Sequence, residues 1–197
     1  MNIILASASP RRSELLKKIY ANFSIVPSLI EETVPNEIRT ESSAEYLAVK
    51  KAVSVLSKES DSLVIACDTI VLINDIILGK PKDENDARRM MEMLRGNRHK
   101  VITGCCLSSY LVSEERPVTL SFSEVTEVEF YPLTDNEIEQ YLSEGEFSDK
   151  AGGYGIQGKG ALLVKGIIGD YYNVMGLPIS RLKREIEQFM KNCLKIT

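Results

Sequence analysis

The sequence contains a single histidine, His99, among its 197 residues, and this scarcity excludes several kinds of site. A zinc centre built from several histidines has no second imidazole to use, and a Ser-His-Asp triad would depend on this one residue. His99 is followed by Lys100-Val101 and by Thr103-Gly104, a pattern that suggests the start of a strand. We therefore interpret His99 as a structural residue.

Cysteine is also scarce, and its spacing does not suggest a metal site. The four cysteines have no CxxC spacing among them, and they are Cys67, Cys105, Cys106 and Cys193. Adjacent cysteines within an apolar stretch, as at 105 and 106, are typical of buried thiols. We expect a protein of the reducing cytoplasm.

Neither positive charge nor long apolar runs are present in excess. The 24 Lys and Arg residues are outnumbered by 28 Asp and Glu, giving a net charge of −4 and a pI of about 5.3. This balance argues against broad nucleic-acid binding, although a local basic cluster could still hold a small anion. The apolar runs fall far short of the ~20 residues that span a bilayer. No basic segment precedes the first apolar run, so we expect neither a signal peptide nor a membrane partner.

What the chain does have is an alternation of strand and helix patterns, with 44% apolar residues for a core. This alternation favours an α/β fold in a single domain spanning residues 1–197, with or without two lobes. A helix is also expected between the cap Asp83 and Gly96, and another between the Thr134–Glu137 capping box and Gly145. Turns are expected at Asn74-Asp75 and near Gly169-Asp170. We predict strands at residues 2–6, 23–26, 63–67, 69–73, 76–78, 101–111 and 118–130, and helices at residues 10–19, 43–57 and 178–194.

The most informative stretch joins the first strand to the first helix. Ser7, Ser9, Arg11 and Arg12 lie around Pro10, which suits the first turn of a helix. Free backbone N–H groups at such a junction attract anions, and two guanidinium groups add bidentate recognition of phosphate or carboxylate. A plain helix start with solvated arginines is an equally good interpretation of this stretch alone.

Two charged residues interrupt apolar patterns further along. Lys51 lies on the apolar stripe of the second helix, whereas Lys50 lies off it. A lysine on an inward face must snorkel, pair with an acid or reach a ligand. Asp68 follows the buried run at residues 63–67, so we expect it at the C-terminal end of a central strand, where open α/β sheets place their sites.

Three further segments carry candidate polar groups. Lys80 lies in Gly79-Lys80-Pro81 after a hairpin strand, and Glu31 and Glu32 lie in a loop; each could simply be solvated. The glycine-rich residues 152–160 match neither a Walker loop nor a Rossmann fingerprint, but Gln157 offers a planar edge suited to reading a base. One hypothesis joins these points: Arg11, Arg12, Lys51 and Lys80 bind phosphates, while Glu32 and Asp68 hold a divalent metal, a water or both.

In this order the motifs resemble those of the Maf family of nucleotide pyrophosphatases over essentially the whole chain. Cys67 departs from the alanine common in the family, and Glu31 from a frequent aspartate. The resemblance is carried by residues 5–12 (LASASPRR), Glu31-Glu32, Lys51-Ala52, Asp68-Thr69, Gly79-Lys80-Pro81, residues 99–104 (HKVITG) and residues 149–158 (DKAGGYGIQG).

The resemblance implies a fold and a reaction. The fold would be an elongated mixed sheet flanked by helices, with two lobes and an active-site cleft between them, as in inosine triphosphatases. The reaction would be hydrolysis of nucleoside triphosphates to monophosphate plus diphosphate with a divalent cation, Mg²⁺ or Mn²⁺. The Gly-Tyr-Gly-Ile-Gln-Gly segment is similar to the subfamily acting on dTTP and UTP. A nucleoside triphosphate is thus the expected partner, with a homodimer as the candidate assembly.

The resemblance also implies roles for individual residues. Asp68 matches the proposed proton acceptor, which we expect to act as general base. Glu32, rather than Glu31, matches the acidic cleft residue, and with Asp68 it is the candidate metal ligand. The other cleft residues are Ser7, Arg12, Lys51 and Lys80, and the positions tied to base preference are Arg11, Thr69 and Gln157.

Two alternatives to this function stay open at the sequence level. The same residues would serve a house-cleaning enzyme acting on modified nucleotides, and only a substrate panel separates the two. A nucleotide-sensing or cell-division-inhibiting interaction protein, a role associated with some Maf members, would bind nucleotide without releasing diphosphate. A sensor needs no water-activating carboxylate, so the charged constellation favours an enzyme.

Overall fold

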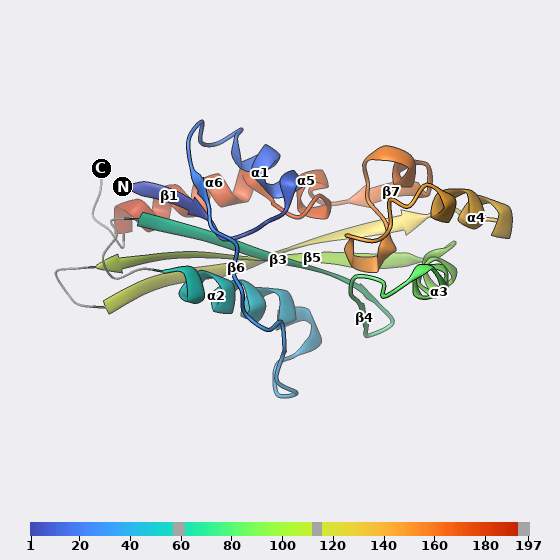
Figure 1. The fold of residues 1–197 in the computed structure, drawn as a ribbon, viewed down its shortest axis with the longest axis horizontal. Coiled ribbons are helices and arrows are strands. Elements are labelled where there is room, and N and C mark those ends of the chain that lie inside the picture. The colour runs from blue at the N-terminus through green and yellow to red at the C-terminus, as the bar shows by residue number, and fades with distance from the viewer. Residues whose placement is uncertain (57–61, 112–115, 193–197) are drawn as a thin grey trace. The chain divides into compact units, whose positions relative to one another are not determined.

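The structure, a computed structural model, describes residues 1–56, 62–111 and 116–192. Its strands pair in the order β2-β1-β3-β5-β6-β7, and β4 pairs with β3 (Figure 1). The β1 strand runs parallel to β2 and β3, whereas β3–β4 and β6–β7 are antiparallel. The predicted α/β class with a mixed sheet is therefore confirmed. The strands are β1 (Asn2–Leu5), β2 (Ser24–Ile25), β3 (Ser62–Ile73), β4 (Ile76–Leu78), β5 (Arg98–Leu111), β6 (Arg116–Phe130) and β7 (Val164–Ile168).

The helices begin where the sequence provides caps. Ser9 Oγ accepts from the Arg12 N–H at the start of α1, and Asp83 accepts from the Asp86 N–H before α3. Both bonds of the predicted capping box, between Thr134 and Glu137, open α4. The described α-helices are α1 (Pro10–Leu16), α2 (Ser43–Val55), α3 (Glu84–Leu94), α4 (Asp135–Ser143), α5 (Tyr171–Val174) and α6 (Ile179–Asn192), and short 3-10 helices lie at η1 (Thr40–Ser42), η3 (Ala151–Gly153) and η4 (Gly158–Leu162).

The chain forms two compact units, each assembled from separate segments. The first unit comprises Met1–Asp68, Thr103–Ser123 and Gly176–Thr197, and the second comprises Thr69–Ile102 and Glu124–Met175. Strands β3, β5 and β6 contribute residues to both units. A single domain with a cleft between two lobes stays a prediction.

The first unit packs α2 very closely against its strands. Gly104 of β5 allows this, because a Cβ there would lie 2.2 Å from the Glu45 nitrogen. Small side chains continue the contact, and the cluster they form contains Ala6, Ala48, Ala52, Val64, Ala66 and Cys106. The predicted burial of Cys105 and Cys106 is confirmed, since both are 0% exposed. Helix α2 is therefore held at a short distance from β5.

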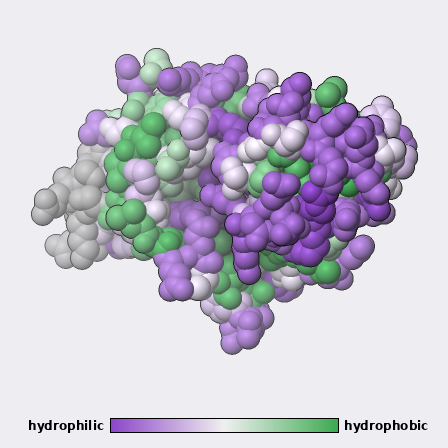
Figure 2. Space-filling model, turned by 45° about the vertical axis from the view of Figure 1, so that its right-hand side comes forward, coloured by the Kyte–Doolittle hydropathy of each residue, from purple (hydrophilic) through white to green (hydrophobic). Residues whose placement is uncertain are grey.

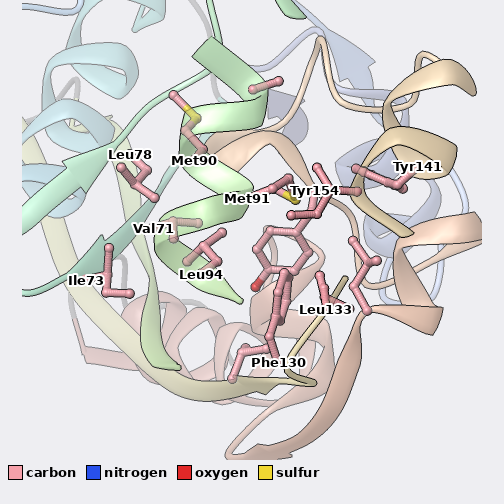
Figure 3. Close-up of a cluster of buried hydrophobic side chains, with 14 of the residues drawn as sticks. Val71, Ile73, Leu78, Met90, Met91, Leu94, Phe130, Leu133, Tyr141 and Tyr154 are labelled. Atoms are coloured by element: carbon pink, nitrogen blue, oxygen red, sulfur yellow. The ribbon is translucent and has the colours of Figure 1, made fainter. Parts of the chain in front are cut away.

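The core of the second unit lies between α3, α4 and the strands (Figure 3). Met90 and Met91 of α3 point into it, together with Phe130 and Tyr154. The ring of His99 lies edge-on to the rings of both Phe130 and Tyr154, at centroid distances of 5.1 and 5.4 Å. His99 is thus a core residue of this unit.

Three local predictions were wrong. Thr69, Ile70 and Val71 continue the extended backbone without a turn residue, so β3 is one strand and Asp68 lies inside it rather than at its end. Between Gly169-Asp170 and the last described residue, Asn192, the chain forms helices and no strand, because Asp170 caps α5 instead of turning a hairpin. The first helix ends at Leu16 rather than near residue 19.

Other local predictions hold within the described residues. Asn74 and Asp75 have φ values of 48° and 62°, as a two-residue hairpin turn requires, between β3 and β4. Residue 57 and residues 193–194, the expected ends of two helices, lie outside the described residues. Among the described helices, none is both long and apolar enough to cross a membrane. Figure 2 shows one face of the surface, on which hydrophilic residues predominate and hydrophobic residues form smaller groups.

Candidate active site

The first unit brings three of the predicted site residues together. Lys51 Nζ lies 2.5 Å from Asp68 Oδ1 and 2.7 Å from Glu32 Oε1. The Lys51 and Asp68 side chains are 10% and 11% exposed, whereas the Glu32 side chain is 56% exposed. Burial of a charged pair carries a desolvation cost that an apolar pair would avoid, so such a pair marks a candidate functional site.

Each of these residues is placed by a different element. Helix α2 directs Lys51 inward from its apolar face, as the sequence pattern predicted, and Asp68 meets it from β3. The β1 strand ends at Leu5, which pairs with Ile65, so β3 continues past the end of this neighbour before it reaches Asp68. Asp68 thus lies three residues beyond the last β3 residue that pairs with β1.

The segment from Ser7 to Arg12 leaves the sheet beside this part of β3. Arg12 Nε donates to the Gly176 carbonyl at 2.9 Å, and its Nη1 donates to Ser7 Oγ at 3.3 Å. Ser7 is 8% exposed and also accepts from the Ser9 N–H at 3.2 Å. The structure therefore orders Arg12 from two sides, while Arg11 is half-buried on the same short helix.

Arg12 also acts on the thiol next to Asp68. A hydrogen bond with Cys105 is the main cause that lowers the pKa of Cys67, and the positive charges of Arg12 and Lys51 contribute. The two sulfur atoms are 3.5 Å apart, and burial raises the pKa of Cys105.

The second unit carries the other predicted residues. Lys80 is exposed after β4, and its neighbour Gly79 accepts from the Gly152 N–H at 2.9 Å, which joins this turn to the glycine-rich loop. Gln157 is exposed in that loop. Thr69 is half-buried and follows Asp68 directly in β3. These assignments stay predictions.

Two carboxylates, Glu32 and Asp68, are the candidate metal ligands. Both lie within ion-pair distance of one cationic group, Lys51 Nζ. Across the described ranges there is no group of three or more His, Cys, Asp or Glu residues suited to a metal ion. Mg²⁺ is commonly held by one or two carboxylates plus substrate phosphates and water, so this donor pair fits such a cation.

Sequence reasoning missed one contributor to this arrangement. Lys50 donates from Nζ to the backbone carbonyls of Glu31 and Thr33, at 3.2 and 3.3 Å. The adjacent lysines of α2 are the sequence feature that could have indicated this contact. Where one lysine points inward, its neighbour lies about 100° around the helix and can reach the adjacent loop.

Known proteins resemble this chain over most of its length. The family model for Maf-like proteins matches residues 2–189. The chain belongs to the Maf family. A Maf relative from Carboxydothermus hydrogenoformans, named dTTP/UTP pyrophosphatase, is 48% identical over 96% of this chain and 99% of that protein. Proteins of the same name from Bacillus cereus strain G9842 and Halalkalibacterium halodurans are 48% and 47% identical, over 95% and 94% of both chains.

A solved structure supports the fold of this Maf protein. A HAM1 protein from Coxiella burnetii superimposes with a TM-score of 0.52 at 16% sequence identity, over 95% of this chain and 99% of that one. At this identity the likeness concerns the fold alone.

Proposed function

We propose that this Maf protein hydrolyses dTTP and UTP to the nucleoside monophosphate and diphosphate. The single observation that carries the proposal is the shielded Lys51–Asp68 pair, with Glu32 on the same ammonium group. Relatives at 48% identity carry the name of this activity, which supports the substrate class. Phosphoanhydride hydrolysis needs charge neutralisation, positioning and water activation, and this cluster combines an ammonium group with two carboxylates.

In the proposed reaction Asp68 is the general base. Its carboxylate accepts a proton from a water molecule as the water oxygen bonds to the α-phosphorus. The bond between the α-phosphorus and the bridging oxygen breaks, and diphosphate leaves with the electron pair. Lys51, 2.5 Å from Asp68 Oδ1, orients the carboxylate, and Arg12, Lys51 and Lys80 bind the phosphates.

A divalent cation, Mg²⁺ or Mn²⁺, would be held by Glu32 and Asp68, and when bound it supplies neutralisation of phosphate charge. Recognition of the pyrimidine base is assigned to Arg11, Thr69 and Gln157, and Ser7 orients Arg12 through the 3.3 Å hydrogen bond. The cytoplasmic location and the homodimer remain predictions.

The test is a nucleotide panel with diphosphate detection in the presence of Mg²⁺. It compares standard and base-modified triphosphates, and the wild type with Asp68→Asn. Loss of a general base should lower kcat by roughly 10²–10⁴-fold. Asp75→Asn, in the exposed turn that follows the same strand, is the matched control and should leave turnover unchanged.

The outcomes separate the candidate functions. Near wild-type turnover in Asp68→Asn would remove Asp68 from the role of base. Higher kcat/KM for base-modified triphosphates than for dTTP and UTP would favour a house-cleaning enzyme. Tight nucleotide binding with no diphosphate released from any triphosphate would reject the hydrolase and favour a sensor.

A further inference from the structure

The acidic loop that carries Glu32 is attached to α2 at several points. Between β2 and η1 the chain forms no helix or strand, and the loop residues Glu31, Glu32 and Thr33 are exposed. Ser28 Oγ and Ser54 Oγ lie 2.8 Å apart, which joins the first part of the loop to the end of the helix. Further attachments come from the two adjacent lysines of α2.

The two lysines hold different parts of the same segment. Lys51 contacts the side chain of Glu32, and Lys50 donates to the backbone carbonyls of the residues on either side, Glu31 and Thr33. The Lys50 ammonium also lies 5.7 Å from the centroid of the Tyr46 ring, one helical turn earlier. Lys50 therefore holds the backbone on both sides of Glu32, through hydrogen bonds to the Glu31 and Thr33 carbonyls.

We propose that Lys50 is a positioning residue, which keeps the Glu32 carboxylate at Lys51 and Asp68 by holding the backbone on both sides of Glu32. The proposal rests on the function proposed above, in which Glu32 belongs to the active site. An ion pair whose acid is 56% exposed is weak by itself and does not fix a loop. Two hydrogen bonds from one ammonium group reduce the number of backbone conformations in which Glu32 faces away.

The proposal is tested first without substrate, by limited proteolysis. A glutamate-specific protease should cut after Glu31 or Glu32 faster when this segment leaves α2, because a detached segment fits a protease more readily than a held one. Lys50→Met keeps the aliphatic stem and removes both hydrogen bonds, so cleavage at this loop should become several-fold faster than in the wild type. Lys50→Arg retains donors for both carbonyls and should cleave at the wild-type rate. Lys183→Met removes an exposed helix lysine of the same unit and is the control.

The second arm measures diphosphate release with a double-mutant cycle. Lys50→Met should lower kcat/KM for dTTP by roughly tenfold, because small misplacements of a positioned group are costly, and Lys50→Arg should restore it. If Lys50 acts through Glu32, then Lys50→Met should have no further effect in a Glu32→Gln background. A merely structural role would instead lower kcat/KM equally in both backgrounds.

The two arms fail in different ways. Equal cleavage of the wild type and Lys50→Met would overturn the positioning role, whatever the activity. Additive losses in the double-mutant cycle would overturn it as well. A third result is possible, in which Lys50→Met is cleaved faster than the wild type but the wild type releases no diphosphate. This result would support the role of Lys50 in holding the loop and would reject the proposed function.

Discussion

Lys51 is a charged residue on the apolar face of a helix, and there it contacts two carboxylates of the candidate site. Its position on the apolar stripe of α2 was visible in the sequence, because helical spacing places it with Ala48 and Ala52. Its partners were not, since Glu32 and Asp68 come from a loop and a strand elsewhere in the chain. Replacement of the ion pair by apolar residues would remove its desolvation cost, so its presence is better explained by function than by stability.

His99 permits a test of pH dependence at a single residue, because it is the only histidine. Burial lowers its pKa from the ordinary 6.5 to about 4. As the pH falls below 6.5, the unfolded chain gains a proton that the folded protein does not accept until about pH 4. The free energy of unfolding should therefore fall by about 2 kcal/mol between pH 7.5 and 5 through this residue.

The measurement is urea denaturation of the wild type and His99→Gln across this pH range. The free energy of unfolding should decrease less in the variant than in the wild type as the pH falls. The difference between the two pH dependences gives the contribution of the imidazole, because the carboxylates contribute equally to both proteins. If the free energy of unfolding changed with pH equally in both proteins, the lowered pKa of His99 would be contradicted. His99 Nε2 lies 2.6 Å from the Tyr154 hydroxyl, so the variant also tests how much this buried contact contributes at neutral pH.

At the scale of elements, caps and periodicity predicted most helices, and long-range pairing decided the strands. The Thr134–Glu137 capping box lies where expected because both of its bonds are local. The interruption expected at Asp68 is absent because Thr69, Ile70 and Val71 continue the extended backbone beyond the polar residue. Asp170 was expected in a turn between strands, but it caps α5 through a bond from the Tyr172 N–H.

The close contact of α2 with β5 predicts a strong effect of one methyl group. In Gly104→Ala the new Cβ would lie 2.2 Å from the Glu45 nitrogen and 2.3 Å from the Ala44 carbonyl carbon, so the helix must move. We expect a loss of about 3 kcal/mol or more in the free energy of unfolding. Gly79→Ala has no atom within 4 Å of its new Cβ and should change stability by less than about 0.5 kcal/mol. Chemical denaturation of both variants checks this, and similar stabilities would contradict the contact.

At the scale of the whole molecule, three strands link the two units through the chain itself. The boundaries between the units fall within β3, β5 and β6, so neither unit is a continuous stretch of sequence. Loss of one unit would remove the extended backbone on which the other depends. Such an arrangement favours a single cooperative unfolding transition.

This cooperativity can be followed with one probe in each unit. In a Cys193→Ser background the remaining thiols are Cys67, Cys105 and Cys106, all 0% exposed in the first unit. The imidazole resonance of His99 reports on the second unit. We expect thiol labelling by a bulky reagent and the His99 signal to change at the same urea concentration. Midpoints that differ would show that the units unfold separately.

The sequence by itself determined the α/β class, the capped helices, the hairpin turn at Asn74-Asp75 and the inward direction of Lys51. These depend on local spacing, on backbone conformations that few residues adopt and on the burial of apolar side chains. Tertiary structure alone decided that Lys51 meets both Glu32 and Asp68, that Asp68 lies within a strand and that Lys50 grips the neighbouring loop. The reason is physical: short-range patterns specify which way a side chain points, whereas its partner depends on which distant segment the packed sheet and helix bring within a few ångströms of it.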